Sequence, residues 1–396
     1  MSPASDRVFV CACLLLPCSF LCPPTRAAQN APDAKPSTGS LVIAPQFDSA
    51  SPFSEGLAAV QVSEAEGWKW GYIDKAGSFA IKPRFDAAQD FSEGLAAVRI
   101  GDEKTGQWGF IDKSGSMVIS LRWDHVTAFS RGLAVVRTGT PLTGNERIIN
   151  QQGKYVSDLK SAVVLPCGNG LTLVGINVSW VENGVNRRFG FVDQSGKFVI
   201  KPAFGDAFCF TEGMAAVRAG DADTGKWGFI DSTGAFVLDP QWGFAFPFKN
   251  GVATVARAGT KKKWGAIDKT GAEFIPLEYP EPLIFSDGFA IVSKTTYQWG
   301  TNEAGNAKLL PDTLYSFVDE HGSRAIASEW RSASSFAQDL APVMAGESPT
   351  GKWGYIDKTG RFLVSPRFDD ARPFSEGMAA VLIRDHDTER WGYIAR

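Results

Sequence analysis

The sequence has little of what enzymes and nucleic-acid-binding proteins commonly use. It contains three histidines among 396 residues, and its 40 Lys and Arg residues are balanced by 43 Asp and Glu residues to a formal net charge of −3. Because the basic residues are scattered, no nucleic acid partner is expected. No segment matches a phosphate-binding loop, a dinucleotide fingerprint, a nucleophile elbow or a paired-histidine zinc motif. We therefore expect no enzymatic activity, no catalytic residue, no cofactor and no metal site.

Long apolar runs are also missing, apart from one near the N-terminus. Residues 8–22 are apolar but are interrupted by Pro17, and they are fewer than the roughly 20 that a membrane-spanning helix needs. With Arg7 before this run and Ala27 and Ala28 after it, the pattern is that of a secretory signal peptide. We predict a signal peptide at residues 1–27, a disordered linker at 28–40 and one repeat domain at 41–396. The mature protein would lie in the periplasm, at the cell surface or outside the cell, with no stable membrane span. A lipid anchor at Cys18 is the weaker alternative.

Sustained 3.6-residue periodicity is absent as well, which predicts an all-β chain. Glycine and tryptophan are abundant instead, with 41 and 12 residues, and they recur in two interlocked phrases. The first is KWGYIDKTG at residues 352–360, with other copies beginning at residues 69, 107, 188, 226 and 263. The second is FSEGLAAV, which begins, with variations, at residues 53, 91, 129, 167, 210, 248, 285, 336 and 374.

The spacing of these phrases is regular. Most FSEGLAAV phrases start 38 residues apart, which predicts about nine β-units of 38 residues. Each WG pair begins 21 residues before the next FSEG phrase, and the same spacing exposes two units, at Glu146 and Tyr315, that have lost the tryptophan. All length variation falls between LAAV and WG, with 5 extra residues around 175–188 and 13 around 293–314. We expect these enlarged connections to be surface loops that share one face.

Each unit is predicted to contain a β-hairpin, a third strand and a short fourth strand. WGYID and FVI are apolar runs joined by a glycine turn, LAAV is the third strand, and P-x-F-D-x-A is an edge strand that tolerates proline. Residues 95–98 are apolar at odd and even positions alike, so both faces of the strand must be covered.

The two incomplete units favour a closed ring. Residues 41–50 lack a preceding WG strand, and residues 391–394 lack the strands that should follow, so the two fragments complete one unit. A closed β-propeller-like ring, in which 391–394 pair with 41–43, would leave no open sheet edge. An open β-solenoid is the alternative.

The two phrases at fixed spacing, with the P-x-F-D-x-A step between them, resemble the WG-repeat family of bacterial proteins. The resemblance covers residues 41–394. It implies a β-repeat scaffold, often exported and mostly without an assigned activity, and it supplies no catalytic motif. The units at Glu146 and Tyr315 depart from the pattern because they lack the tryptophan.

Only two cysteines, Cys167 and Cys209, remain after removal of the predicted signal peptide. An even number suits an oxidising compartment. They hold nearly equivalent places in adjacent units, so neighbouring strands could bring them within the roughly 4.4 to 6.8 Å between Cα atoms that a disulfide requires. Two free thiols packed as small apolar side chains are the alternative.

The recurring acidic residues are expected to serve structure and the irregular aromatic residues to serve binding. The aspartate of each WGYID phrase, such as Asp112, is predicted to accept backbone hydrogen bonds in its turn, and the glutamate of FSEG, such as Glu55, to cap a turn likewise. Repeated tryptophans are expected in the core. No packing rule demands the aromatic residues of the variable connections, so the candidate ligand-binding residues are Trp68, Trp180, Tyr297 and Trp299.

These features predict an exported, non-enzymatic binding scaffold that presents loops on one face to a protein or a cell-surface glycan. The alternatives are a propeller-type enzyme with a site of dispersed acidic residues and a structural spacer. Exposed aromatic residues gathered on one face would favour a binding protein, whereas a pocket with perturbed carboxylates would favour an enzyme.

Overall fold

The structure, a computed structural model, describes residues 37–65, 67–140, 145–156, 163–167, 170–181, 184–193, 197–259, 263–301, 307–346, 350–385 and 388–396. The predicted signal peptide and most of the predicted linker lie outside these residues. Residues 36–396 form one compact unit. No helix occurs within the described part of that unit, which confirms the all-β prediction.

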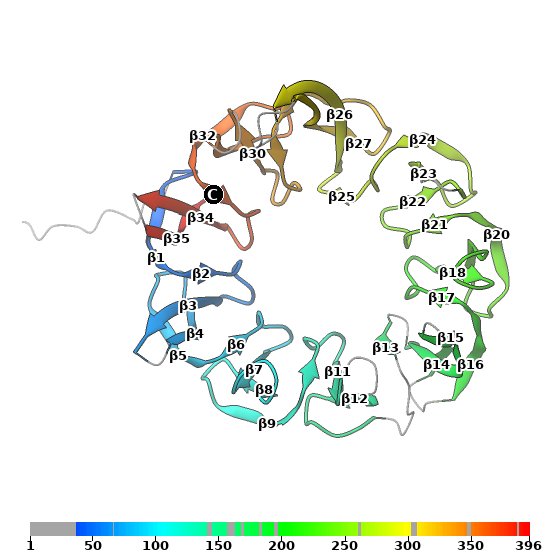
Figure 1. The fold of residues 1–396 in the computed structure, drawn as a ribbon. Coiled ribbons are helices and arrows are strands. Elements are labelled where there is room, and N and C mark those ends of the chain that lie inside the picture. The colour runs from blue at the N-terminus through cyan, green and yellow to red at the C-terminus, as the bar shows by residue number, and fades with distance from the viewer. Residues whose placement is uncertain are drawn as a thin grey trace, which may run out of the picture. The chain divides into compact units, whose positions relative to one another are not determined.

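The described strands form nine small antiparallel sheets, called blades here and numbered in chain order (Figure 1). The second blade shows the pattern. Its innermost strand has two residues, the LAAV and WGYID phrases form the two middle strands, and a seven-residue strand lies outermost: β6 (Ala87–Ala88), β7 (Leu95–Ile100), β8 (Gln107–Asp112) and β9 (Met117–Trp123).

The other blades repeat this order with local changes, and the third has three strands within the described residues. The first blade is β2 (Ser49–Ala50), β3 (Ala58–Glu64), β4 (Gly67–Ile73) and β5 (Phe79–Phe85). The third is β10 (His125–Val126), β11 (Leu133–Thr138) and β12 (Asn145–Asn150). The fourth is β13 (Val163–Pro166), β14 (Thr172–Val181), β15 (Gly184–Val192) and β16 (Phe198–Phe204). The fifth is β17 (Asp206–Ala207), β18 (Ala215–Ala219), β19 (Lys226–Ile230) and β20 (Phe236–Trp242).

The sixth to ninth blades follow in the same way. The sixth is β21 (Phe244–Ala245), β22 (Ala253–Ala256), β23 (Trp264–Ile267) and β24 (Glu273–Tyr279). The seventh is β25 (Phe285–Ser286), β26 (Phe289–Thr301), β27 (Ala307–Asp319) and β28 (Ile326–Trp330). The eighth is β29 (Ser332–Ala333), β30 (Ala341–Ala345), β31 (Lys352–Ile356) and β32 (Phe362–Phe368). The ninth joins both ends of the domain: β33 (Asp370–Ala371), β34 (Met378–Asp385), β35 (Thr388–Ala395) and β1 (Leu41–Phe47).

Neighbouring blades cover both faces of each LAAV strand. Ala96 and Val98 pack in a core shared with the first blade, whereas Leu95 and Ala97 pack in a core shared with the third. Because successive side chains of a strand point to opposite faces, a strand between two blades must be apolar throughout. The core is therefore divided among the junctions between blades.

The glycine of each WG pair allows the outermost strand to cross closely. A Cβ atom added at Gly109 would lie 2.5 Å from the carbonyl oxygen of Ile119 on β9, and the corresponding distances at the other WG glycines are 2.4 to 2.7 Å. The β8–β9 pairing shifts register at this point, between Trp108 and Phe110. The WG pair thus marks the place where the outermost strand of a blade approaches the third strand most closely.

The predicted edge strand P-x-F-D-x-A does not form as one strand. Pro83 and Phe85 belong to β5, the outermost strand of the first blade, whereas Ala87 and Ala88 form the innermost strand of the second. The proline lies on an outer edge, as expected, because it has no N–H to donate to a further strand. The phrase therefore connects one blade to the next.

Pairing between the chain's first and last described strands closes the ring (Figure 1). Strand β1 runs antiparallel to β35, with Leu41 opposite Ile394 and Ile43 opposite Tyr393. The Tyr393 hydroxyl donates a 2.7 Å hydrogen bond to the carbonyl oxygen of Ser51 in the first blade. The predicted closed propeller-like ring is confirmed, and the open solenoid is wrong.

Candidate functional site

The two ends of the ring differ in what they present. At the hairpin end, loops such as residues 101–106 and 220–225 join the second and third strands of each blade. At the opposite end, called the turn end, lie the FSEG turns and the aspartate-capped turns such as residues 112–116. Antiparallel order places these two sets of connections at opposite ends of every blade.

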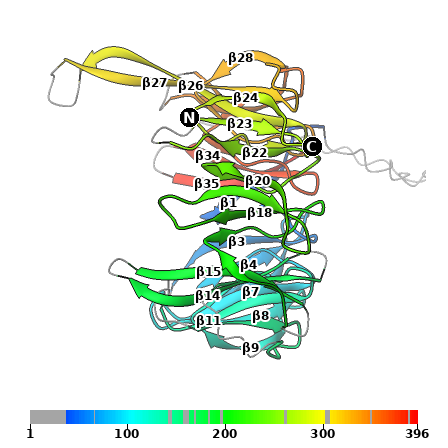
Figure 2. The same ribbon diagram turned by 90° about the vertical axis from the view of Figure 1, so that its right-hand side faces the viewer.

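The two enlarged connections form long hairpins rather than irregular loops. Strands β14 and β15 pair as far as Val181 and Gly184, and strands β26 and β27 pair as far as Thr301 and Ala307. They belong to the fourth and seventh blades, and Figure 2 shows both projecting from the hairpin end. The expectation that they share one face is confirmed, although the additional residues lengthen strands.

The predicted aromatic candidates all lie on strands that flank the hairpin end. Trp68 on β4 is 65% exposed, and Tyr297 and Trp299 on β26 are 64% and 76% exposed. Trp180 belongs to β14, and its side chain lies outside the described residues. Trp68 is in the first blade and Tyr297 and Trp299 are in the seventh, so the structure brings only the latter two together.

Tyr297 and Trp299 lie on one face of the long seventh-blade hairpin, because they are two residues apart on one strand. Leu309, 42% exposed, is directly opposite Trp299 on β27. These three side chains form what we call the aromatic hairpin face. It is an apolar surface that no described part of the ring buries.

A second feature of the hairpin end is a pocket of about 330 Å³ between the fifth and sixth blades. Arg218, Arg257 and Asp206 line it together with the rings of Trp227 and Phe244. These rings belong to an aromatic row in which Phe208 lies 5.4 Å from Trp227, and Phe244 lies 4.8 Å from Trp227. Sequence analysis missed this row. Its signal was phenylalanine at 208, 244 and 246, where the first two blades have Ser, Ala or Gln.

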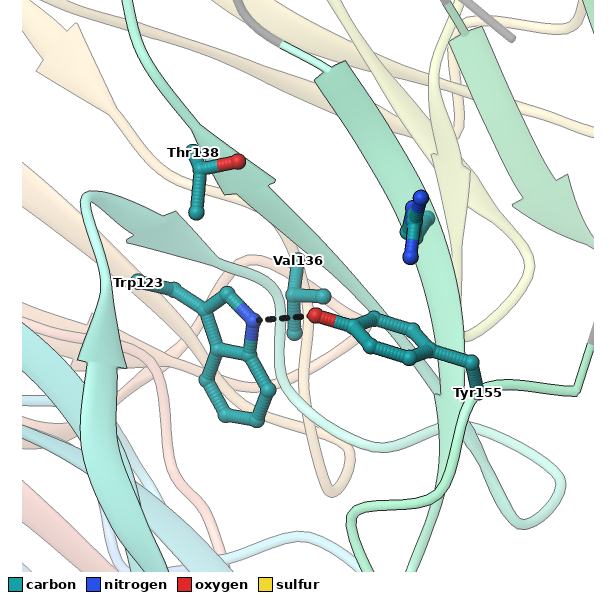
Figure 3. A pocket seen from close by; sticks show the side chains of 5 residues that line it. Trp123, Val136, Thr138 and Tyr155 are labelled. Atoms are coloured by element: carbon teal, nitrogen blue, oxygen red, sulfur yellow. Dashed lines mark hydrogen bonds between the residues drawn. The ribbon is translucent and has the colours of Figure 1, made fainter. Parts of the chain in front are cut away.

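A smaller pocket of about 150 Å³ lies beside the third blade and is lined by Trp123, Val136, Thr138, Arg147 and Tyr155. Figure 3 shows the side chains of Trp123 and Tyr155 pointing toward each other. The indole Nε1–H of Trp123 donates to the hydroxyl oxygen of Tyr155 at 3.4 Å. The only sequence signal for this pocket was indirect, namely the missing WG pair at residue 146.

At the turn end, most acidic groups are engaged in structure. Asp112 accepts hydrogen bonds from the backbone N–H groups of Ser114 and Ser116, as predicted for the WGYID aspartates. The Ser114 hydroxyl also donates to Asp112, and these hydrogen bonds hold the pKa of this carboxyl below its usual value.

The FSEG glutamates cap turns, as predicted. Each described FSEG glutamate caps the turn of the next blade, not its own: Glu55 accepts from the backbone N–H of Gly94, and Glu376 accepts from that of Gly56. Glutamate at this position has a positive φ, 53° at Glu55, which aims the side chain across the junction. Asp90 behaves differently, because burial raises the pKa of its carboxyl.

The structure joins Cys167 and Cys209 in a disulfide, with 5.0 Å between the Cα atoms. The bond connects the fourth and fifth blades. Within the described ranges, no group of three or more His, Cys, Asp or Glu side chains could hold a metal ion. The described residues also include no helix that is long and apolar enough to cross a membrane.

Nine four-stranded or three-stranded antiparallel sheets around a closed ring define a nine-bladed β-propeller. The sequence model described as WG containing repeat matches residues 37–64, 70–103, 108–139, 189–221, 227–259, 264–295 and 353–385. These segments cover more than half of the chain, which therefore belongs to this family. The units at residues 146 and 315, which lack the tryptophan, are not matched.

Solved structures share the fold at low sequence identity. The chain is similar to the crystal structure of the eukaryotic initiation factor, with 12% identity and a TM-score of 0.55 over 90% of this chain and 92% of that chain. The β-propeller domain of the Trilobed protease from Pyrococcus furiosus matches at 8% identity and a TM-score of 0.38, over 74% of this chain and 100% of that chain. Such likeness concerns the fold alone. No curated protein sequence matches the chain.

Proposed function

We propose that the protein is an exported, non-enzymatic binding scaffold that offers the hairpin end of its ring to a protein or a cell-surface glycan. The aromatic hairpin face carries this proposal. Trp299 and Tyr297 are 76% and 64% exposed and lie side by side on one strand, and Leu309 extends their surface. Exposed apolar patches of this kind mark interaction sites, and Tyr and Trp supply much of the binding energy at such sites.

Export is supported by two independent features. Residues 1–27 have the pattern of a signal peptide, although they lie outside the described structure. The Cys167–Cys209 disulfide suits an oxidising compartment. N-terminal sequencing of protein recovered from the periplasm or the medium should give residue 28 as the first residue, whereas an intact Met1 would contradict export.

The binding proposal is tested with the mature protein on a glycan array and against a peptide-display library. We expect a saturable ligand in one of the two screens. Replacing Tyr297 and Trp299 together with Ala should weaken its affinity by roughly 30-fold or more, the effect of losing about 2 kcal/mol at a binding hot spot. Leu363→Ala is the control, because Leu363 is 48% exposed on the outermost strand β32, away from the hairpin.

A second set of variants tests the hairpins as elements. Shortening β14–β15 and β26–β27 to the length of the other connections should preserve the melting temperature, because the paired blade cores are retained, and should abolish binding. If binding and stability both survive the two deletions, the hairpins are merely tolerated and the protein is better described as a spacer.

The alternative of an enzyme with dispersed acidic residues has less support. The aspartates and glutamates of the repeat phrases accept hydrogen bonds within turns or between blades, so they are committed to structure. Asp90 is the acidic group whose pKa burial raises, and it faces Ser51 and Arg372 rather than a second acid.

A further inference from the structure

The third blade departs from the repeat at its most constrained position. Its third strand has Glu146 at the position of the WG tryptophan, which is Phe189 in the fourth blade and Tyr315 in the seventh. Arg147 stands at the position of the WG glycine, as the pairing of Val136 with Arg147 matches that of Val98 with Gly109. A Cβ atom at the WG glycine would lie within 2.4 to 2.7 Å of a backbone oxygen of the outermost strand. An arginine there excludes the close crossing.

The described start of the outermost strand keeps the usual register in this blade, because Ile149 bridges Tyr155 as Ile111 pairs with Met117 in the second blade. Residues 157–162, where that strand would continue, lie outside the described residues. The 150 Å³ pocket lies between β11, β12 and Trp123 at the end of β9. Its volume equals that of roughly five water molecules, enough for a small organic ligand.

Arg147 differs from the other arginines of the repeat. Arg84, Arg122 and Arg367 each donate to the carbonyl oxygen of a neighbouring turn glycine: Gly115, Gly153 and Gly39. Those three arginines also stack on aromatic rings, as Arg147 does on that of Tyr155 at 4.7 Å. The difference is that no described carboxylate or carbonyl oxygen accepts a hydrogen bond from Arg147. The neighbouring Glu146 is engaged with Arg137, at 3.8 Å.

The lining of the pocket offers hydrogen-bond donors between apolar walls. Arg147 carries a positive charge and a planar fork of N–H groups, and the hydroxyls of Tyr155 and Thr138 can both donate. Trp123 and Val136, each 1% exposed, line its buried side, and Tyr155, 44% exposed, is the accessible ring. Among the described residues, no acidic side chain lines the pocket. Guanidinium groups recognise carboxylates through two parallel hydrogen bonds, and ring faces stack on aromatic walls.

We propose that this pocket binds a small organic carboxylate, with Arg147 as the charged partner and Trp123 and Tyr155 as the walls. The site is separate from the aromatic hairpin face, since it lies in the third blade rather than the seventh. The carboxylate could belong to an acidic sugar or to the terminus of a peptide, and the two sources share the same recognition chemistry.

The test is calorimetric titration of the full mature protein with D-glucuronate, N-acetylglycine, D-glucose and inorganic phosphate. We expect saturable binding of D-glucuronate or N-acetylglycine, and which of them binds more tightly identifies the source. Protein labelled with ¹⁵N in its tryptophans should show a shift of the Trp123 indole signal, assigned with a Trp123→Phe variant. Equal binding of D-glucose or phosphate, or no binding of either carboxylate, would overturn the proposal.

Variants at the pocket separate recognition from folding. Arg147→Gln should weaken carboxylate binding by roughly 10-fold to 100-fold, as expected for loss of a charged hydrogen-bond partner. Arg147→Lys should recover only part of the affinity, because it keeps the charge without the fork. Arg131→Gln, which changes an exposed arginine of the same blade at the turn end, should bind as the unmodified protein does. Tyr155→Phe provides a milder second variant if Arg147→Gln fails to fold, and unchanged affinity in both would contradict the assignment.

Discussion

At the scale of single residues, the repeat depends on the WG glycines, which have no Cβ atom. The WG glycines are needed because a Cβ would meet the backbone of the outermost strand, and their φ angles lie outside the left-handed region. The seventh blade has Ser316 at this position, and β28 still pairs with β27 there, over five residues rather than the usual seven. The third blade has Arg147 at this position, and residues 157–162, which would pair beside it, lie outside the described residues.

Gly109→Ala should therefore lower the free energy of unfolding by about 3 kcal/mol, the effect of overpacking against a backbone that cannot move aside. Gly94→Ala is the matched control. Gly94 has a φ of +82° but nothing within 4 Å of an added Cβ, so it should lose about 1 kcal/mol from backbone strain alone. Urea denaturation of both variants measures the difference, and an equal loss would contradict the steric account.

At the scale of the element, the FSEG turn connects blades rather than capping itself. Glu212 of the fifth blade accepts a hydrogen bond from the backbone N–H of Gly251 in the sixth at 3.0 Å, and Lys269 pairs with it at 2.9 Å. The hydroxyl of Ser54 likewise donates across a junction, to the carbonyl oxygen of Phe91. A turn motif that repeats every 38 residues can therefore hold each blade against the next.

This arrangement predicts a pH-dependent contribution to stability. The ion pair with Lys269, followed by the Gly251 N–H, holds the pKa of Glu212 below its ordinary value, against the opposing effect of burial. A carboxyl with a lowered folded-state pKa stabilises the fold above the unfolded value of about 4.3 and loses that contribution as pH falls through the folded value.

Glu212→Gln should thus lower stability near pH 7 by at most about 1 kcal/mol, since the pair is partly exposed to solvent. The deficit should vanish at pH 3 and shrink in high salt. Glutamine keeps an oxygen that can accept from the Gly251 N–H, just as Gln338 of the eighth blade accepts from the N–H of Gly377 in the ninth. The variant therefore removes the charge and keeps the hydrogen bond. Glu103→Gln, in an exposed loop at the hairpin end, is the matched surface control. A deficit that persists at pH 3 would rule out this account.

Much of the fold was predictable because the same local sequence signals recur at a fixed spacing, which indicates repeated β-units. The fixed 21-residue spacing indicated which segments pack, and the apolar character of residues 95–98 indicated cover on both faces. The split of P-x-F-D-x-A between two blades was not predictable, because the change of sheet at Asp86 depends on the neighbouring blade. Which turn each glutamate caps was not predictable for the same reason, since the partners lie 39 residues away.

The candidate sites were predictable in part. Aromatic residues in connections of variable length, such as Tyr297 and Trp299, stand out because they fall outside the repeat. Their cross-strand neighbour Leu309 required the register of the hairpin. Predicting the pocket at Arg147 would have required knowing that the WG glycine lies against the backbone of the outermost strand. The spacing of the phrases does not reveal that contact.

At the scale of the whole molecule, the ring leaves no blade at an open edge. The ninth blade takes three strands from the end of the domain and one from its start, and its core contains Trp391 and Tyr393 together with Ile43 and Phe47. The junction with the first blade has the same contacts as the others: Ser375 donates to the carbonyl oxygen of Phe53, as Ser54 does to that of Phe91. This junction between the ninth and first blades, called the seam here, thus has the same construction as the other junctions.

Closure should therefore stabilise the entire ring. Deleting residues 391–396 removes three large buried side chains, at about 3 kcal/mol each, and exposes strand edges on the first and ninth blades. We expect a single calorimetric transition at a much lower melting temperature, because each remaining blade depends on its neighbours for cover. The control is the variant with a shortened β26–β27 hairpin, which also loses chain but leaves the seam intact.

A finer test of the seam uses matched tyrosines. The hydroxyl of Tyr72 donates to the carbonyl oxygen of Gln89 at an internal junction in the same way as that of Tyr393 donates to Ser51 at the seam, at 2.8 and 2.7 Å. Tyr393→Phe and Tyr72→Phe should each lose about 1 kcal/mol, the usual effect of removing one such hydrogen bond. If Tyr393→Phe has no effect while Tyr72→Phe does, the seam is open in solution. A deletion of 391–396 that melts no lower than the hairpin control would lead to the same conclusion, because strands that contribute no stability cannot be closing the ring.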